Sequence, residues 1–148
     1  MKFFVTGNVR SSKGPRNILL LAYFLFLLFL ISNLFLAISQ NSFRYEDFIL
    51  TLEPSLIIRL EEVHISLFMF GFYLIFIFAM LYQSRWKMKI KNILFGISIV
   101  LFVFYLLSLL IYDEALWFFY FYYGVLFTFH LFFLVLQFLL ILDLLYEK

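Results

Sequence analysis

The chain has 148 residues, of which 66% are hydrophobic and 14% are charged, with a formal net charge of +2 and a mean hydropathy of +1.07. A soluble domain carries about 25% charged residues, so a water-soluble fold of this size could not bury so much apolar surface. The chain has no cysteine, which excludes disulfides, zinc–thiolate sites, iron–sulfur ligation and thiol nucleophiles. The composition therefore predicts an integral membrane protein.

The N-terminal segment, residues 1–16, is basic and contains no acidic residue. Gly14 and Pro15 are expected to break any helix just before the first apolar run. That run, from about 17 to 38, carries no charge and is long enough to cross about 30 Å of hydrocarbon. It has no small-residue cleavage site at its end, which indicates a retained transmembrane helix rather than a signal peptide.

The next segment, residues 39–62, mixes charged and apolar residues. Its apolar side chains recur at helical spacing, first at Phe48, Ile49 and Leu52 and then at Leu56 and Leu60. This pattern is typical of short amphipathic helices at a membrane surface. Proline is favoured in the first turn of a helix, where its missing N–H costs nothing. A second transmembrane helix is therefore predicted over about 54–82, starting at Pro54.

The second half of the chain contains two more apolar runs. A basic connection that includes Trp86 as an interfacial aromatic residue precedes a helix predicted over about 92–112. Asp113 and Glu114 then form a tight turn into a helix over about 115–146. Short connections favour a single domain over residues 1–148: an all-α membrane protein whose four transmembrane helices form an up-down-up-down bundle. Interdigitated Phe, Leu and Ile side chains are expected to supply the helix packing, with Gly71, Gly96 and Gly124 as candidates for close crossings.

Basic residues are distributed unevenly between the two sides of this topology. All but two of the 11 Lys and Arg residues lie in the N-terminal segment, the second connection and the C-terminus. The exceptions are Arg44 and Arg59 in the first connection. By the positive-inside rule, both termini should face the cytoplasm or an equivalent compartment, across a bacterial or organellar inner membrane.

His130 is the deepest titratable residue, near the middle of the last helix. At helical spacing it shares a face with Tyr123 and Gln137, and with Phe127 and Leu134 between them. One hypothesis makes His130, Tyr123 and Gln137 a cofactor site for haem b or a quinone at a subunit interface. The alternative is a neutral histidine that hydrogen-bonds across the bundle, because lipid offers no hydrogen bonds. The expected partners for this bond are Tyr73, Ser98, Tyr105, Ser108 and Gln137.

A second candidate site lies at the start of the second transmembrane helix. Glu61 and His64 form a Glu-x-x-His pair on one helical face, a spacing that occurs twice in di-iron bundles but once here. A metal site at this pair would need further ligands from Glu53, Glu46 or Asp47. The alternative is an ordinary contact between surface side chains.

No phosphate-binding loop, dinucleotide fingerprint, nucleophile elbow or nucleic-acid-binding module is present in the sequence. The leading hypothesis is a non-enzymatic accessory or structural subunit that contacts membrane lipids and packs against other integral membrane subunits or a second copy of itself. The first alternative is a redox-associated membrane anchor that uses His130. A third hypothesis is a small channel or carrier that oligomerises around the face of His130 and Gln137.

Overall fold

A computed structural model describes residues 13–40, 43–51, 55–111 and 115–146. Nearly all of these residues are helical, and the helices are connected by short segments. The five helices are α1 (Lys13–Gln40), α2 (Tyr45–Thr51), α3 (Leu56–Gln83), α4 (Met88–Leu110) and α5 (Leu116–Leu145).

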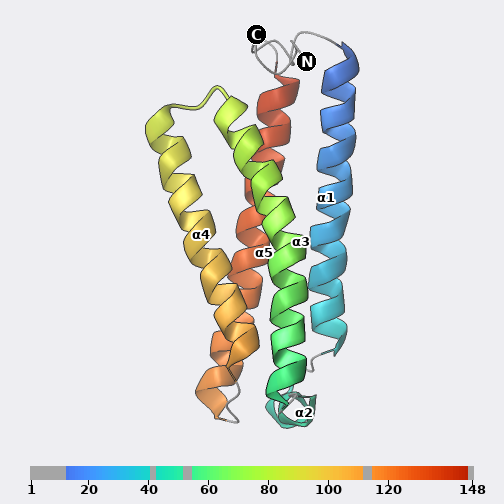
Figure 1. The fold of residues 1–148 in the computed structure, drawn as a ribbon, viewed down its shortest axis with the longest axis vertical. Helices are drawn as coiled ribbons and strands as arrows, with labels where there is room; N and C mark the ends of the chain where they lie inside the picture. Colours follow the sequence, from blue (N-terminus) through green and yellow to red (C-terminus); the bar gives the residue numbers. More distant parts are fainter. Residues whose placement is uncertain (1–12, 41–42, 52–54, 112–114, 147–148) are drawn as a thin grey trace.

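Four helices, α1, α3, α4 and α5, are long and apolar enough to cross a membrane, which confirms the predicted all-α, four-span membrane fold. Figure 1 shows that α1 and α4 run in one direction and α3 and α5 in the other. The start of α1 and the end of α5 therefore lie at the same end of the bundle, together with the α3–α4 connection. Helix α2 lies at the opposite end.

The observed bounds of two helices correct the sequence-based expectations. Helix α1 begins at Lys13, so the expectation that Gly14 and Pro15 would stop a helix before residue 17 is wrong. Proline in the first turn gives up no intrahelical hydrogen bond, and its fixed φ suits the helix. Helix α4 begins at Met88, ahead of the expected start at 92. Both helices thus extend the apolar runs into the adjoining basic segments.

The start of α3 also differs slightly from the expectation. Ser55 has an extended backbone and the helix begins at Leu56, after the expected start at Pro54, which itself lies outside the described residues. The helix then continues through His64 to Gln83, as predicted.

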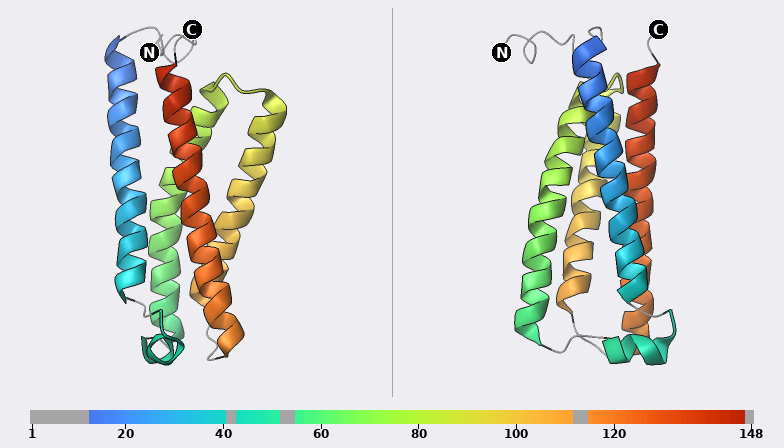
Figure 2. Two further views of the ribbon diagram at one scale, coloured as in Figure 1. Left: turned by 180° about the vertical axis from the view of Figure 1, so that it is seen from behind. Right: turned by 90° about the vertical axis from the view of Figure 1, so that its right-hand side faces the viewer.

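Helix α2 confirms the amphipathic segment expected between the first two transmembrane helices. Phe48 is buried, and its ring packs against Phe118, Phe119 and Tyr122 of α5 at centroid distances of 6.2, 5.2 and 5.5 Å. Leu50, on another face of α2, is 84% exposed. Figure 2 shows α2 lying across the end of the bundle, roughly perpendicular to the long helices. The ring of Tyr45, 5.9 Å from that of Phe119, adds a second contact, so aromatic side chains attach this surface helix to α5.

Helix α5 is central to the packing of the bundle, because it contacts α1, α2, α3 and α4. Helix α3 packs closely against α4. Aromatic rings connect α1 to α3, with Phe26 5.4 Å from Tyr73 and Phe29 5.2 Å from Phe70 between centroids.

Glycines do not create the close crossings that the sequence suggested. A Cβ atom added at Gly71, Gly96 or Gly124 would meet no heavy atom of a neighbouring helix within 4 Å. The expectation of tight backbone approach at these positions is therefore wrong. Large apolar side chains separate the helices instead, as the many phenylalanine contacts in the core show.

Basic side chains close the helix ends on both sides of the α3–α4 hairpin. At one end, Nη1 of Arg59 donates to the carbonyl oxygen of Leu110 at 2.6 Å. At the other end, Nζ of Lys91 donates to the carbonyl oxygens of Tyr82 and Ser84 at 2.7 and 2.6 Å. Each bond satisfies carbonyls that the helix itself leaves unpaired at a C-terminus, where a positive charge is also favourable.

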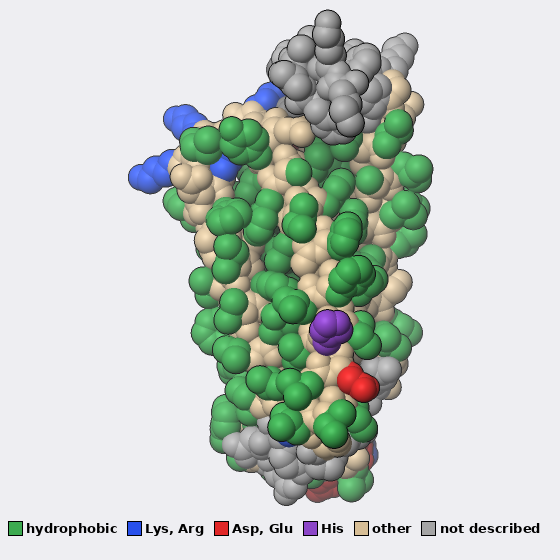
Figure 3. Space-filling model, viewed as in Figure 1, with side chains coloured by type: hydrophobic (Ala, Val, Ile, Leu, Met, Phe, Trp, Pro, Cys, Tyr) green, Lys and Arg blue, Asp and Glu red, His purple; other side chains and the backbone are tan. Residues whose placement is uncertain are grey.

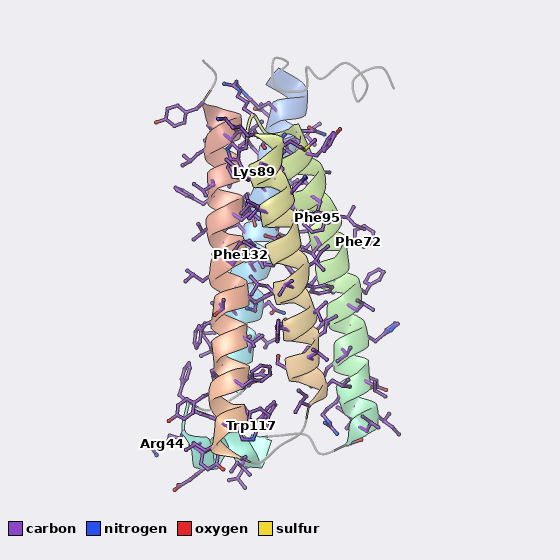
Figure 4. The ribbon with its side chains drawn as sticks, turned by 90° about the vertical axis from the view of Figure 1, so that its left-hand side faces the viewer. Arg44, Phe72, Lys89, Phe95, Trp117 and Phe132 are labelled. Atoms are coloured by element: carbon purple, nitrogen blue, oxygen red, sulfur yellow. The ribbon has the colours of Figure 1, made fainter. Side chains whose placement is uncertain are left out.

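The lateral surface of the bundle is apolar. Figure 3 shows one face on which hydrophobic side chains cover most of the length of the helices, while basic side chains project beside the α3–α4 connection. Phe72, which is 62% exposed, points away from the neighbouring helices in Figure 4. Such a surface suits a hydrocarbon environment and agrees with the membrane assignment.

Candidate functional site

The polar side chains at the centre of the bundle form the best-defined candidate site. His130 is fully buried on α5. The rings of Phe129, Phe70 and Tyr105 surround its imidazole, with centroids at 5.3, 6.0 and 6.0 Å and edge-to-face geometry. These rings come from α5, α3 and α4, so three helices enclose the imidazole.

Both nitrogens of His130 have partners. Nδ1 lies 2.8 Å from the carbonyl oxygen of Leu126, one turn earlier in α5, and Nε2 lies 3.0 Å from Oδ1 of Asn33 on α1. A carbonyl oxygen only accepts, so Nδ1 carries a proton, and in a neutral imidazole Nε2 is then an acceptor. The pair is complete when the Asn33 amide turns its NH₂ group toward Nε2. This arrangement keeps the imidazole uncharged in a medium that penalises charge.

The partner of His130 differs from those expected. The prediction that His130 lies inside the bundle beside a hydrogen-bonding side chain is confirmed, but the predicted partners are wrong. The hydroxyls of Ser98 and Ser108 donate instead to carbonyl oxygens of their own helix, at 2.8 Å for Leu94 and 2.7 Å for Tyr105. Intrahelical bonding of this kind is common for serine in apolar helices. Because these serines bond within their own helices, the side-chain partner of the His130 imidazole is the amide of Asn33 on α1.

From the sequence, Asn33 near the outer end of the first helix is expected to cap that helix or to bond to a neighbouring helix, and His130 is not identified as its partner. The helix extends to Gln40, so Asn33 lies about two turns inside it. The signal that identifies Asn33 as a partner is its amide group within an uncharged apolar run, because lipid cannot satisfy an amide.

Gln137 links three helices. The hydroxyl of Tyr73 on α3 donates to Oε1 of Gln137 at 3.1 Å, and Nε2 of Gln137 donates to the carbonyl oxygen of Tyr23 on α1. Gln137 and Tyr73 are both fully buried. The amide thus uses its acceptor on one neighbouring helix and its donor on another. The bonds of His130 and Gln137 to α1 define what is called here the α1–α5 seam.

Tyr123 lies on the same face of α5, one heptad before His130, which in turn lies one heptad before Gln137. Its surroundings are aromatic, with Phe119 at 5.0 Å and Phe43 at 5.2 Å between ring centroids. The structure therefore brings His130 and Gln137 into the seam and places Tyr123 in an aromatic cluster nearer to α2. Phe127, predicted to share this stripe, is 40% exposed.

The geometry of the seam bears on the cofactor and channel hypotheses. A haem iron or a quinone oxygen could bond to His130 only by displacing Leu126 or Asn33 from a ring nitrogen. The face that carries His130 and Gln137 is buried within the bundle, so an oligomeric channel around it would require separation of these helices. The cofactor roles of His130, Tyr123 and Gln137 remain hypotheses that require a second arrangement of the seam.

The other candidate pair, Glu61 and His64, lies on the surface. Both side chains are exposed and line a shallow hollow with Ile57, Leu60 and Ile65 on the first turns of α3. Among the residues that the structure describes, no group of three or more His, Asp or Glu side chains is placed to hold a metal. Of the additional ligands proposed, Glu46 and Asp47 lie on α2, while Glu53 lies outside the described residues. The described residues therefore add no third ligand to the pair.

The site connects helices through hydrogen bonds. His130 and Gln137 are fully buried and bond to the half-buried Asn33, to the hydroxyl of Tyr73 and to the backbone carbonyl of Tyr23. No family model matches this chain, and comparisons with curated proteins and with solved structures gave no match.

Proposed function

We propose that this integral membrane protein is a non-enzymatic accessory or structural subunit, which packs against other membrane subunits in a larger complex. The observation that carries this proposal is the use of its buried polar side chains. His130 bonds to Asn33, and Gln137 bonds to Tyr73 and to the Tyr23 carbonyl, so these groups join helices to one another. Interhelical hydrogen bonds of this kind stabilise association in a bilayer.

The outer surface supports the same proposal. Large apolar side chains remain exposed on every long helix, among them Phe24 and Phe35 on α1 and Phe138 on α5. In a membrane, such side chains contact lipid or the transmembrane helices of other subunits. A bundle that buries His130 and Gln137 and exposes apolar side chains along its length fits a packing role.

Purification from the native membrane in a mild detergent tests the subunit role. The chain should carry an affinity tag and be expressed at its natural level, with an unrelated four-span protein carrying the same tag as the control. We expect a second membrane protein to co-purify in stoichiometric amount with this chain and not with the control. Recovery of the chain alone, from cross-linked membranes as well as from detergent, would contradict the proposal.

An absorption spectrum of the same preparation separates the subunit role from the redox alternative. A b-type haem produces a Soret band, which protein alone lacks. We expect the tagged chain, purified together with its partner protein, to show no Soret band. A Soret band that is lost in His130→Leu and kept in His64→Leu would favour the redox anchor instead.

We also propose that both termini face the cytoplasm or the equivalent compartment, in a bacterial or organellar inner membrane. The support is the concentration of Lys and Arg in the segments before α1, between α3 and α4 and after α5, since the start of α1, the α3–α4 connection and the end of α5 lie at one end of the bundle. Reporters that are active on only one side of the membrane, fused after Asn41 and after Lys148, should give opposite signals. The Lys148 fusion should report the cytoplasmic side, and a reversed pair would contradict the orientation.

A further inference from the structure

The connection between α3 and α4 concentrates positive charge in a short stretch. Arg85, Lys87, Lys89 and Lys91 alternate with other residues from the end of α3 into the first turn of α4. The structure divides the lysines of this stretch into two groups with different surroundings.

Lys91 is directed toward the protein. Its ammonium group donates to the carbonyl oxygens of Tyr82 and Ser84, and it lies 5.8 Å from the centroid of the Tyr82 ring. These contacts place the charge at the C-terminus of α3, where carbonyl dipoles stabilise it. Lys91 thus stabilises the connection by bonding to the carbonyl oxygens at the end of α3.

Lys87 and Lys89 are directed away from the protein. Both are exposed, and neither side chain has a hydrogen-bond or ion-pair partner among the residues that the structure describes. The carboxylate of Asp143, at the same end of the bundle, instead accepts the backbone N–H of Arg85 at 3.4 Å. Figure 4 places Lys89 at this end, opposite Trp117 and Arg44. Within the part of the chain that the structure describes, two positive charges are therefore without an acidic partner.

The depth of these lysines in the bilayer follows from the length of α4. Its 23 residues span about 34 Å, slightly more than the roughly 30 Å of hydrocarbon in a bilayer. The start of α4 therefore lies at the level of the lipid headgroups. Trp86, which is half-buried, and Tyr82, which is 71% exposed, flank the connection in the way that interfacial aromatic residues do.

We propose that Lys87 and Lys89 bind the headgroup phosphates of anionic phospholipids. At this depth the nearest external anions are lipid phosphates, and a lysine ammonium donates up to three hydrogen bonds to such oxygens. Anionic lipids attract basic juxtamembrane residues by about fivefold in affinity for each lysine, which corresponds to about 1 kcal/mol. This inference goes beyond the subunit role, because it assigns a ligand to the chain itself and does not depend on a partner protein.

The experiment uses the full chain, reconstituted in phosphatidylcholine nanodiscs with and without phosphatidylglycerol. The readout is the preference for phosphatidylglycerol over phosphatidylcholine, measured by native mass spectrometry or with spin-labelled lipids. For Lys87→Gln plus Lys89→Gln we expect the preference to fall by roughly twenty-five-fold, since two contributions of about fivefold multiply. The loss should shrink in high salt, because salt screens exposed charges.

Two control variants make the test specific. Lys87→Arg plus Lys89→Arg keeps both charges and should keep the lipid preference. Lys91→Gln removes a charge from the same connection, but one already bonded to carbonyl oxygens, so the preference should fall by less than twofold. Circular dichroism of each variant should show unchanged helix content.

Three outcomes would overturn the proposal. The first is an unchanged preference in the double glutamine variant. The second is a loss of lipid preference in Lys91→Gln as large as that in the double variant. This would show that the total positive charge of the connection, rather than Lys87 and Lys89, determines the preference. The third is the absence of any preference in the pure protein, combined with loss of an acidic co-purifying protein in the double variant. That last result would assign the surface to a protein partner and would leave the subunit role intact.

Discussion

Helix α5 is held to its neighbours in two different ways. Toward α1 the contact is polar, because His130 meets Asn33 and Gln137 meets the Tyr23 carbonyl. Toward α3 and α4 the contact is mainly aromatic, because Phe129 stacks on Tyr105 with centroids 4.6 Å apart and meets the ring of Phe70 edge-on at 5.1 Å. One hydrogen bond, from the hydroxyl of Tyr73 on α3 to Gln137, adds a polar contact on this side.

The difference reflects how much of each neighbour is covered. In the most apolar stretch of α1, 11% of the residues are buried, against 33% in α3 and 22% in α4. Helices in a bilayer gain no hydrophobic free energy by associating, so packing and hydrogen bonds determine how strongly they associate. A helix with little packed area depends more on directional bonds, which are made in one register alone. The seam thus specifies how α1 aligns on α5, while aromatic rings of α3 and α4 pack against Phe129 of α5.

The largest effect is expected on the aromatic side. Phe129→Ala removes a fully buried ring from the contact of three helices, and such substitutions in packed cores cost about 3–5 kcal/mol. The matched control is Phe138→Ala on the same helix, whose side chain is 59% exposed. Reversible unfolding in mixed micelles should show the loss for Phe129→Ala and little change for the control. Equal losses of unfolding free energy in the two variants would mean that the buried aromatic face of α5 contributes no more to stability than its exposed face.

An intermediate effect is expected for Gln137→Leu. This substitution leaves the buried hydroxyl of Tyr73 without its acceptor, which costs about 1–3 kcal/mol. Adding Tyr73→Phe removes the stranded hydroxyl, so the double variant should be more stable than the sum of the two single losses predicts. Strict additivity in the same unfolding assay would show that the bond between Tyr73 and Gln137 contributes nothing.

A smaller and local effect is expected at the ends of the α3–α4 hairpin. Lys91→Met removes the donor to the Tyr82 and Ser84 carbonyls, at an expected cost of about 1 kcal/mol. Hydrogen exchange should become faster in the last turn of α3 and remain unchanged in the middle of α4. Lys89→Met, which removes an exposed side chain, serves as the control and should leave exchange at both places as it is in the natural chain.

Much of the fold could be predicted from the sequence, because a bilayer leaves few structures for an apolar chain. The charged segments divide the hydrophobic residues into four runs, and each run must be helical to satisfy its own backbone. The helical spacing around Phe48 likewise predicted the surface helix α2. Errors occurred at helix ends such as Gly14 and Pro15, where local preferences are weak compared with continuation of a long helix.

The partners of the site could not be predicted in the same way. That His130 must be satisfied follows from its depth alone, but the choice of Asn33 over serines on facing helices depends on the rotation and relative depth of α1 and α5. Neither quantity is encoded in the spacing of one helix. The glycines teach the same lesson, since Gly71, Gly96 and Gly124 permit a close crossing without producing one.

The central claim, that buried polar side chains serve to hold α1 against α5, is tested most directly by a double-mutant cycle on His130 and Asn33. The cycle compares His130→Leu, Asn33→Leu and the double variant by their free energies of unfolding in a bilayer, measured by steric trapping. We expect a coupling energy of about 0.6 kcal/mol, the average for interhelical hydrogen bonds in membranes, and no more than about 1.7 kcal/mol. Phe127→Leu, a substitution at a 40% exposed position of α5, provides the baseline for an uncoupled site. A coupling energy of zero between His130 and Asn33 would contradict the claim.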